Sequence, residues 1–130
     1  MTLPAKFLIL AMLGLIPIAL SYGLFPPITM HFLFGIEAEG INFVQIFRAI
    51  MGLYLALALF WLLGAYKQKY RLPALYSLVV FMLGLGSGRL LSLVIDGMPH
   101  WLLFVYLLLE IGLGLTGIFM IKKSAKEELK

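Results

Sequence analysis

The sequence predicts an all-α integral membrane protein, a bundle of four transmembrane helices with a short interfacial helix in the first outer loop. Of the 130 residues, 63% are hydrophobic and 12% are charged, whereas soluble domains average about 45–50% and about 25%. A chain this short cannot hide so many apolar side chains from water, because a small domain buries only about 60–70% of its surface. The apolar residues also gather in four long segments, which indicates lipid as the solvent.

Each of these segments is close to or above the length of about 18–20 residues that crosses a bilayer as a helix. They cover residues 7–25, 43–66, 73–96 and 101–121. Backbone groups in lipid must be hydrogen-bonded within their own segment, so the segments are predicted to be helices rather than strands. We expect Pro17 to kink the first one. Together they form one membrane domain over residues 1–130.

The loop between the first two segments is the longest. Pro26 and Pro27 are expected to end the first helix. Residues 28–36 are apolar but too short to span a bilayer, so they predict a short helix along the outer interface. Four aromatic residues near the span ends are interpreted as an interfacial belt. They are Trp61, Tyr66, Tyr70 and Trp101.

Lys and Arg residues predict the orientation. Eight of the ten lie in the N-terminal tail, in the loop between the second and third segments, and in the tail from Lys122 to Lys130. The two loops on the other side have none. The positive-inside rule therefore places both termini in the cytoplasm and predicts a solvated C-terminal helix end.

Three ionisable residues lie within the predicted spans. At about 1.5 Å per residue, Arg48, Arg89 and Glu110 lie about 7, 10 and 13 Å from the outer ends of their helices. Charges inside a membrane are costly and indicate a functional site or a buried pair. We expect a bidentate Arg89–Glu110 ion pair, with Arg48 reaching Asp96, a loop carboxylate or a lipid phosphate.

Polar and small residues accompany these charges. Tyr22, Gln45 and Tyr106 are expected to complete the polar cluster, either as a structural staple or as a binding site in a pocket that opens outward. Small residues let membrane helices approach closely. Five glycines are therefore predicted to lie at helix contacts. They are Gly52, Gly84, Gly88, Gly114 and Gly117.

The sequence carries no sign of an enzyme. It has no Cys, which excludes disulfides and thiolate chemistry. His31 and His100 are both predicted outside the membrane, and their spacing from acids resembles no metal site. We expect no catalytic residue, metal or cofactor. The net charge of +4 is explained by the topology and does not indicate a nucleic-acid partner.

Several motifs resemble a family of small bacterial four-helix membrane proteins of unknown function, itself loosely similar to DoxX-type proteins. The residues that carry the resemblance are Phe47-Arg48-Ala49-Ile50-Met51-Gly52, Gly88-Arg89-Leu90-Leu91-Ser92, Asp96-Gly97-Met98-Pro99 and Glu110. The resemblance implies the fold, the polar residues and a bacterial inner membrane. It implies no activity.

Two functions remain open at this point. The first is a non-catalytic accessory or scaffolding subunit that packs in the bilayer against a larger membrane complex or against a second copy. The alternative is a module that binds or transports a lipid or a small anionic ligand through the Arg and Glu residues of the outer half.

Overall fold

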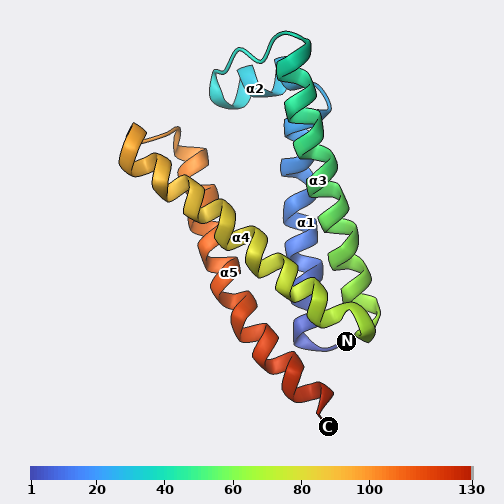
Figure 1. Ribbon diagram of the computed structural model, residues 1–130. Coiled ribbons are helices and arrows are strands. Elements are labelled where there is room, and N and C mark those ends of the chain that lie inside the picture. The colour runs from blue at the N-terminus through green and yellow to red at the C-terminus, as the bar shows by residue number, and fades with distance from the viewer. Residues whose placement is uncertain (130) are drawn as a thin grey trace.

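The computed structural model describes residues 1–129, which form helices and no strand (Figure 1). The helices are α1 (Leu3–Gly23), α2 (Pro26–Phe34), α3 (Ile41–Tyr66), α4 (Gln68–Asp96) and α5 (Trp101–Glu128). All of them except α2 are long and apolar enough to cross a membrane. This confirms the predicted fold class of four spanning helices and one short helix in the first loop.

The helices extend beyond the predicted spans. α4 begins at Gln68 rather than at 73, and α5 continues to Glu128 rather than ending at 121. Hydropathy marks only the part of a helix that lies in hydrocarbon, and these helices continue as polar turns. Lys130, the last residue of the predicted basic tail, lies outside the described residues.

The short helix α2 begins at Pro26, two residues before the predicted start. Proline favours the first turn of a helix, because its fixed φ suits that position and its missing N–H has no partner there. Gly35 ends α2 in the left-handed conformation, with φ 68°; its N–H donates to the carbonyl of His31, and the N–H of Ile36 donates to that of Met30. Met30, a residue of α2, is buried against the bundle.

The four long helices pair in two arms. α1 packs along α3, and α4 packs along α5. Figure 1 shows that the arms meet near the chain termini and diverge toward α2, so the bundle has the shape of a V. We call the closed end, which includes Lys67, Lys69 and Arg71, the basic end. The open end is the α2 end.

Close contacts hold the arms together at the basic end. The Arg71 side chain donates hydrogen bonds from Nε to the carbonyl of Gly64 (3.2 Å) and from a terminal nitrogen to that of Ala65 (2.9 Å). Trp61 is fully buried, and its indole N–H donates to Ser77 Oγ at 3.0 Å. The assignment of Trp61 to an aromatic belt was therefore wrong, since it packs between α3 and α4. Tyr66 and Trp101 are exposed, as a belt requires.

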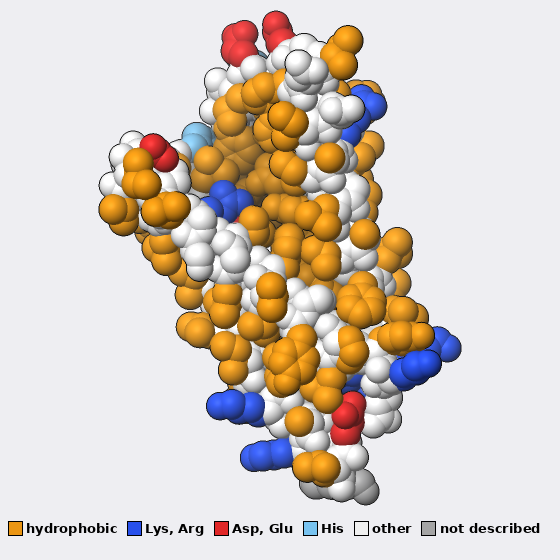
Figure 2. Space-filling view, viewed as in Figure 1, with side chains coloured by type: hydrophobic (Ala, Val, Ile, Leu, Met, Phe, Trp, Pro, Cys, Tyr) orange, Lys and Arg blue, Asp and Glu red, His pale blue; other side chains and the backbone are white. Residues whose placement is uncertain are grey.

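Aromatic contacts bridge the arms at the α2 end. The ring of Phe34, the last residue of α2, makes T-shaped contacts with His100 (5.7 Å between centroids) and Tyr106 (6.5 Å). Between this bridge and the basic end lies a hollow with apolar walls, in which Figure 2 shows Lys or Arg atoms. The shape of the fold thus places a charged group inside an apolar space.

Candidate functional site

An ion pair between α4 and α5 occupies the hollow. Arg89 Nε donates to both carboxylate oxygens of Glu110, each at 2.9 Å. The two side chains are 23% and 10% exposed. The pair predicted from helix depth is therefore present in the structure.

The geometry of the pair differs from the expected bidentate contact. One nitrogen, Nε, serves both oxygens, instead of two guanidinium nitrogens serving one oxygen each. α4 and α5 are packed neighbours, so the carboxylate approaches Arg89 from the side, at the level of Nε. The hydrogen bonds of ordinary length and angle that Arg89 makes within residues 1–129 come from Nε, and the Tyr22 hydroxyl is a further acceptor close to the guanidinium group.

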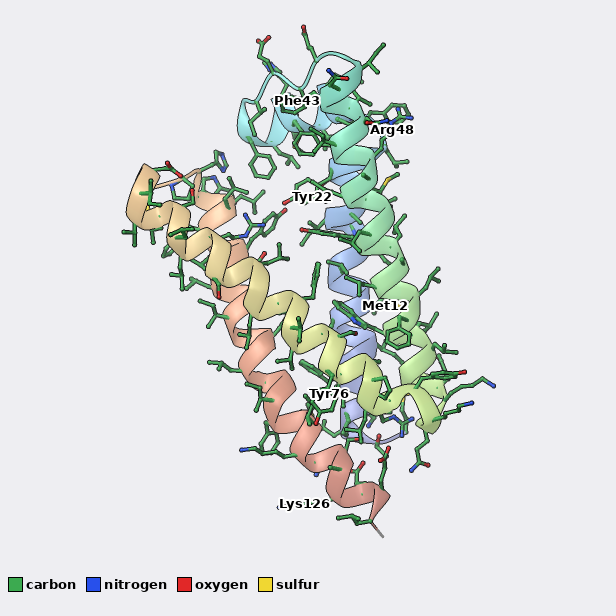
Figure 3. The ribbon with its side chains drawn as sticks, in the orientation of Figure 1. Met12, Tyr22, Phe43, Arg48, Tyr76 and Lys126 are labelled. Carbon is green, nitrogen blue, oxygen red and sulfur yellow. The ribbon has the colours of Figure 1, made fainter. Side chains whose placement is uncertain are left out.

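Three tyrosines surround the guanidinium group. The ring of Tyr106 lies 5.6 Å from the Arg89 guanidinium carbon, within cation–π range. Tyr22 is buried on α1 and points across the hollow toward the α4/α5 arm (Figure 3). Tyr54 on α3 makes an edge contact with the Tyr22 ring at 5.8 Å. The predicted roles of Tyr22 and Tyr106 as neighbours of the pair agree with this placement.

The pair lies at one end of an apolar cavity of about 260 Å³, which we call the central cavity. Arg89, Glu110 and Tyr106 line it on the side nearer α2. Toward the basic end its walls are apolar and come from every long helix. They include Leu10, Gly14, Tyr54, Met82 and Leu113. Leu10 and Gly14 are exposed at the bundle surface, so the central cavity opens sideways toward lipid.

A second cavity, of about 230 Å³, lies beneath α2. Tyr22, Phe34 and Tyr54 are among its walls. Tyr54 lines both cavities and therefore stands between them. Sequence analysis did not identify Tyr54 or Phe34. The signal available for Tyr54 was its position four residues before Ala58 and seven before Trp61, on the face of α3 that is buried.

Two predicted members of the cluster lie elsewhere. Arg48 and Gln45 are exposed on α3, and Figure 3 shows Arg48 pointing away from the bundle. Helix depth had suggested that Arg48 joins Arg89, but depth does not fix the direction in which a side chain leaves its helix. The predicted pocket that includes Arg48 and Gln45 together with Arg89 is therefore wrong.

Asp96 also lies outside the cluster. It is exposed at the end of α4 and accepts a hydrogen bond from Ser92 Oγ at 2.7 Å. It makes no salt bridge with Arg48. The charge balance in the hollow is consequently one Arg against one Glu, with Arg48 and Asp96 excluded.

The predicted packing glycines divide into two groups. A Cβ on Gly114 would meet the side chain of Leu83, and one on Gly117 would lie 2.7 Å from Val79 Cγ2, so both lie at the α4–α5 contact. Gly52, Gly84 and Gly88 have open space around them and are exposed. These three therefore make no close helix contact within residues 1–129. Close contacts that it missed involve Gly23 against Met51 and Gly64 against Ala74.

Comparisons with known proteins give a family and no activity. No curated protein and no solved structure is significantly similar to the chain. A family model described as a domain of unknown function, DUF4345, matches residues 5–121, which include most of every long helix and the whole site. The chain therefore belongs to the DUF4345 family, whose function is unknown.

Proposed function

We propose that this protein is a non-enzymatic membrane protein that binds an amphiphilic molecule in the central cavity. The observation that carries the proposal is that Arg89 binds Glu110 through Nε alone and also lines the apolar central cavity. Its Nε is bonded to Glu110, which leaves its terminal nitrogens, with the Tyr22 hydroxyl as a nearby acceptor, beside the apolar central cavity that Arg89 lines. Donors in apolar surroundings are costly without a partner, so a ligand that supplies oxygen acceptors would be stabilised there.

A purely structural staple accounts less well for this arrangement. A staple is strongest when the carboxylate takes two guanidinium nitrogens in parallel. Here the carboxylate takes one. A staple also needs no apolar cavity beside it, whereas packed interiors leave few voids larger than a water molecule.

The charges and the volume restrict the ligand. Glu110 already neutralises Arg89, so the polar end of the ligand carries acceptor oxygens and no more than one negative charge. The volume of about 260 Å³ is smaller than the roughly 300–1,000 Å³ of pockets for drug-sized molecules. It suits one hydrocarbon chain or a small ring, and the sideways opening lets a longer chain continue into the bilayer.

A cavity-filling variant tests the proposal. We expect Gly14→Phe to abolish retention of a co-purified amphiphile, because a Cβ on Gly14 meets nothing within 4 Å and the ring would occupy the central cavity. The matched control is Gly112→Phe. A Cβ on Gly112 also meets nothing within 4 Å, and this residue lines none of the cavities described above. Native mass spectrometry from a mild detergent, followed by lipid extraction, measures the bound molecule.

The wild-type protein and Gly112→Phe should carry the amphiphile, and Gly14→Phe should not. Wild-type protein without any amphiphile, or equal retention by both variants, would contradict binding in the central cavity.

A second candidate is the accessory or scaffolding subunit. It is favoured by a groove of about 430 Å³ formed by α4, α5 and the turn between them, lined by Gly84, Gly88 and Ser92 among others and also reached by Arg89. Exposed small residues of this kind suit close contact with a helix of another membrane protein or of a second copy. The same mass spectra would then show a bound protein chain in place of an amphiphile.

The proposed location is a bacterial inner membrane, with the basic end in the cytoplasm. The N-terminus, the α3–α4 turn and the end of α5 lie together at this end, and the turns at the α2 end carry no Lys or Arg (Figure 1). Positive residues are retained on the cytoplasmic side during insertion.

We expect a reporter enzyme fused at the C-terminus to be active in the cytoplasm and one inserted at Glu39 to be active outside. Glu39 is exposed in the loop between α2 and α3, so the insertion disturbs no helix. An external C-terminus would reverse the orientation, and the ion pair would then lie in the cytoplasmic half of the membrane.

A further inference from the structure

Arg48 is an exposed cation on a helix that spans the membrane. It lies about 10 Å from the first residue of α3 at a rise of about 1.5 Å per residue. It makes no salt bridge, and no hydrogen bond of its side chain is found within residues 1–129. Figure 3 places it on the side of α3 that faces away from the other arm. A lone guanidinium in hydrocarbon is costly, so it requires an anion from outside the chain.

The direction of the side chain indicates where this anion lies. Side chains on a helix lean toward its N-terminus, and long basic side chains near a helix end extend to the membrane interface. For Arg48 both tendencies point toward the α2 end of α3. The guanidinium therefore lies closer to the lipid headgroups than the backbone of Arg48 does.

Other donors are available on the same face. Gln45 lies three residues before Arg48, and the two side chains border one open hollow with Gly40, Ile41 and Val44. Gly40, the N-cap of α3, supplies no side-chain acceptor, and the first turn contains no acidic residue. The first backbone N–H groups of this turn have no acceptor within the helix and can donate to an external one. They also carry the positive end of the helix dipole.

We propose that this hollow binds the phosphate of a membrane phospholipid, which we call the α3 lipid site. The Arg48 guanidinium and the Gln45 amide would donate to the phosphate oxygens. Apolar side chains lie on the same face of α3 as these donors: Ile41, which is 88% exposed, before Arg48 and Leu59, also exposed, after it. They suit the acyl chains of the same lipid. The α3 lipid site is separate from the central cavity and does not depend on the proposed function.

Phosphate fits these residues better than the carboxylate of a partner protein. The donors combine a cation, an amide and the end of a helix, which together suit a group with several oxygens. The flanking surface is aliphatic and open, as an alkyl chain requires. An acidic partner protein remains a possible outcome of the experiment and would contradict the proposal.

The experiment uses full-length protein stripped of lipid in a neutral detergent. Phosphatidylglycerol is added, and the bound lipid is measured by native mass spectrometry. Diacylglycerol with the same chains tests the need for phosphate, and inorganic phosphate tests the need for chains. We expect Arg48→Gln to weaken phosphatidylglycerol binding about tenfold or more, as the loss of a charge-assisted contact implies. Inorganic phosphate should bind poorly to all variants, and any diacylglycerol held in the central cavity should bind the wild type and Arg48→Gln equally, because Arg48 does not line that cavity.

The matched control is Lys69→Gln, which removes an exposed cation at the basic end and should bind phosphatidylglycerol like the wild type. Arg48 touches no protein acceptor, so Arg48→Gln should unfold at the wild-type temperature without lipid and lose only the rise that phosphatidylglycerol produces. Unchanged phosphatidylglycerol affinity in Arg48→Gln, an equal loss of diacylglycerol affinity in that variant, or loss of a co-purified protein instead of lipid would each overturn the α3 lipid site.

Discussion

Glu110→Leu should destabilise the bundle by about 3 kcal/mol, near the lower end of the cost of breaking a buried ion pair. The substitution leaves the Arg89 guanidinium in an apolar hollow without its carboxylate. Arg89→Leu should cost less, because the remaining carboxyl group can lose its charge by binding a proton, whereas a guanidinium cannot. The free energy of unfolding is measured in detergent micelles for both variants.

The double variant Arg89→Leu/Glu110→Leu decides whether the two residues interact. It removes both charges and leaves apolar side chains in apolar surroundings, so its stability should lie within about 1 kcal/mol of the wild type. Glu110→Gln is the control for shape, since it keeps the volume and one acceptor for Arg89 Nε while removing the charge. If the costs of the two single substitutions simply add in the double variant, the residues are not coupled.

The pair could be predicted from sequence because it depends on two quantities that sequence supplies. Hydropathy gives the start and end of each span, and the rise per residue then gives the depth of each charge. Arg89 and Glu110 lie on consecutive helices joined by a short turn, so their similar depth predicts a contact in a bundle. The structure joins their side chains at 2.9 Å.

Arg48 shows what depth leaves out. It lies at a similar depth, but which side of α3 faces the bundle depends on packing against α1 and α4. The stripe of Gln45, Arg48, Gly52 and Ala56 is a real face of α3, and all four residues are exposed. Small and polar residues predict a contact face there, whereas the buried face combines small residues with aromatic ones. This face is Tyr54, Ala58, Trp61 and Ala65.

The contact face predicted for α5 is the buried one. Its small residues lie on the same side of the helix as Glu110, whose ionic partner Arg89 lies on α4. Glu110, Gly114 and Gly117 are all buried. A charge within a span therefore identifies the inner face of a helix only when a countercharge lies at the same depth on a neighbouring helix. The cavities had no sequence signal, since they arise from the divergence of the two arms.

Gly64, rather than the predicted Gly52, is the glycine of α3 that packs against another helix. A second large effect on stability is therefore expected when Gly64 is substituted. Gly64→Ala should lower the free energy of unfolding by about 1–3 kcal/mol, the usual cost of overpacking. A Cβ there would lie 2.5 Å from Ala74 Cβ and 3.0 Å from the carbonyl oxygen of Tyr70. Neither atom is the end of a flexible side chain, so α3 and α4 would have to separate at the basic end, where the arms are joined.

Gly52→Ala is the matched control on the same helix. A Cβ at Gly52 meets nothing within 4 Å, and alanine favours helix over glycine by about 0.5–1 kcal/mol, so stability should be equal or slightly higher. Thermal unfolding of the two variants in one detergent measures the difference directly. A destabilised Gly52→Ala beside a wild-type-like Gly64→Ala would mean that α3 presents its Gln45–Arg48 face to the bundle. Arg48 would then belong to the polar cluster, and the α3 lipid site and the present arrangement of the arms would both be wrong.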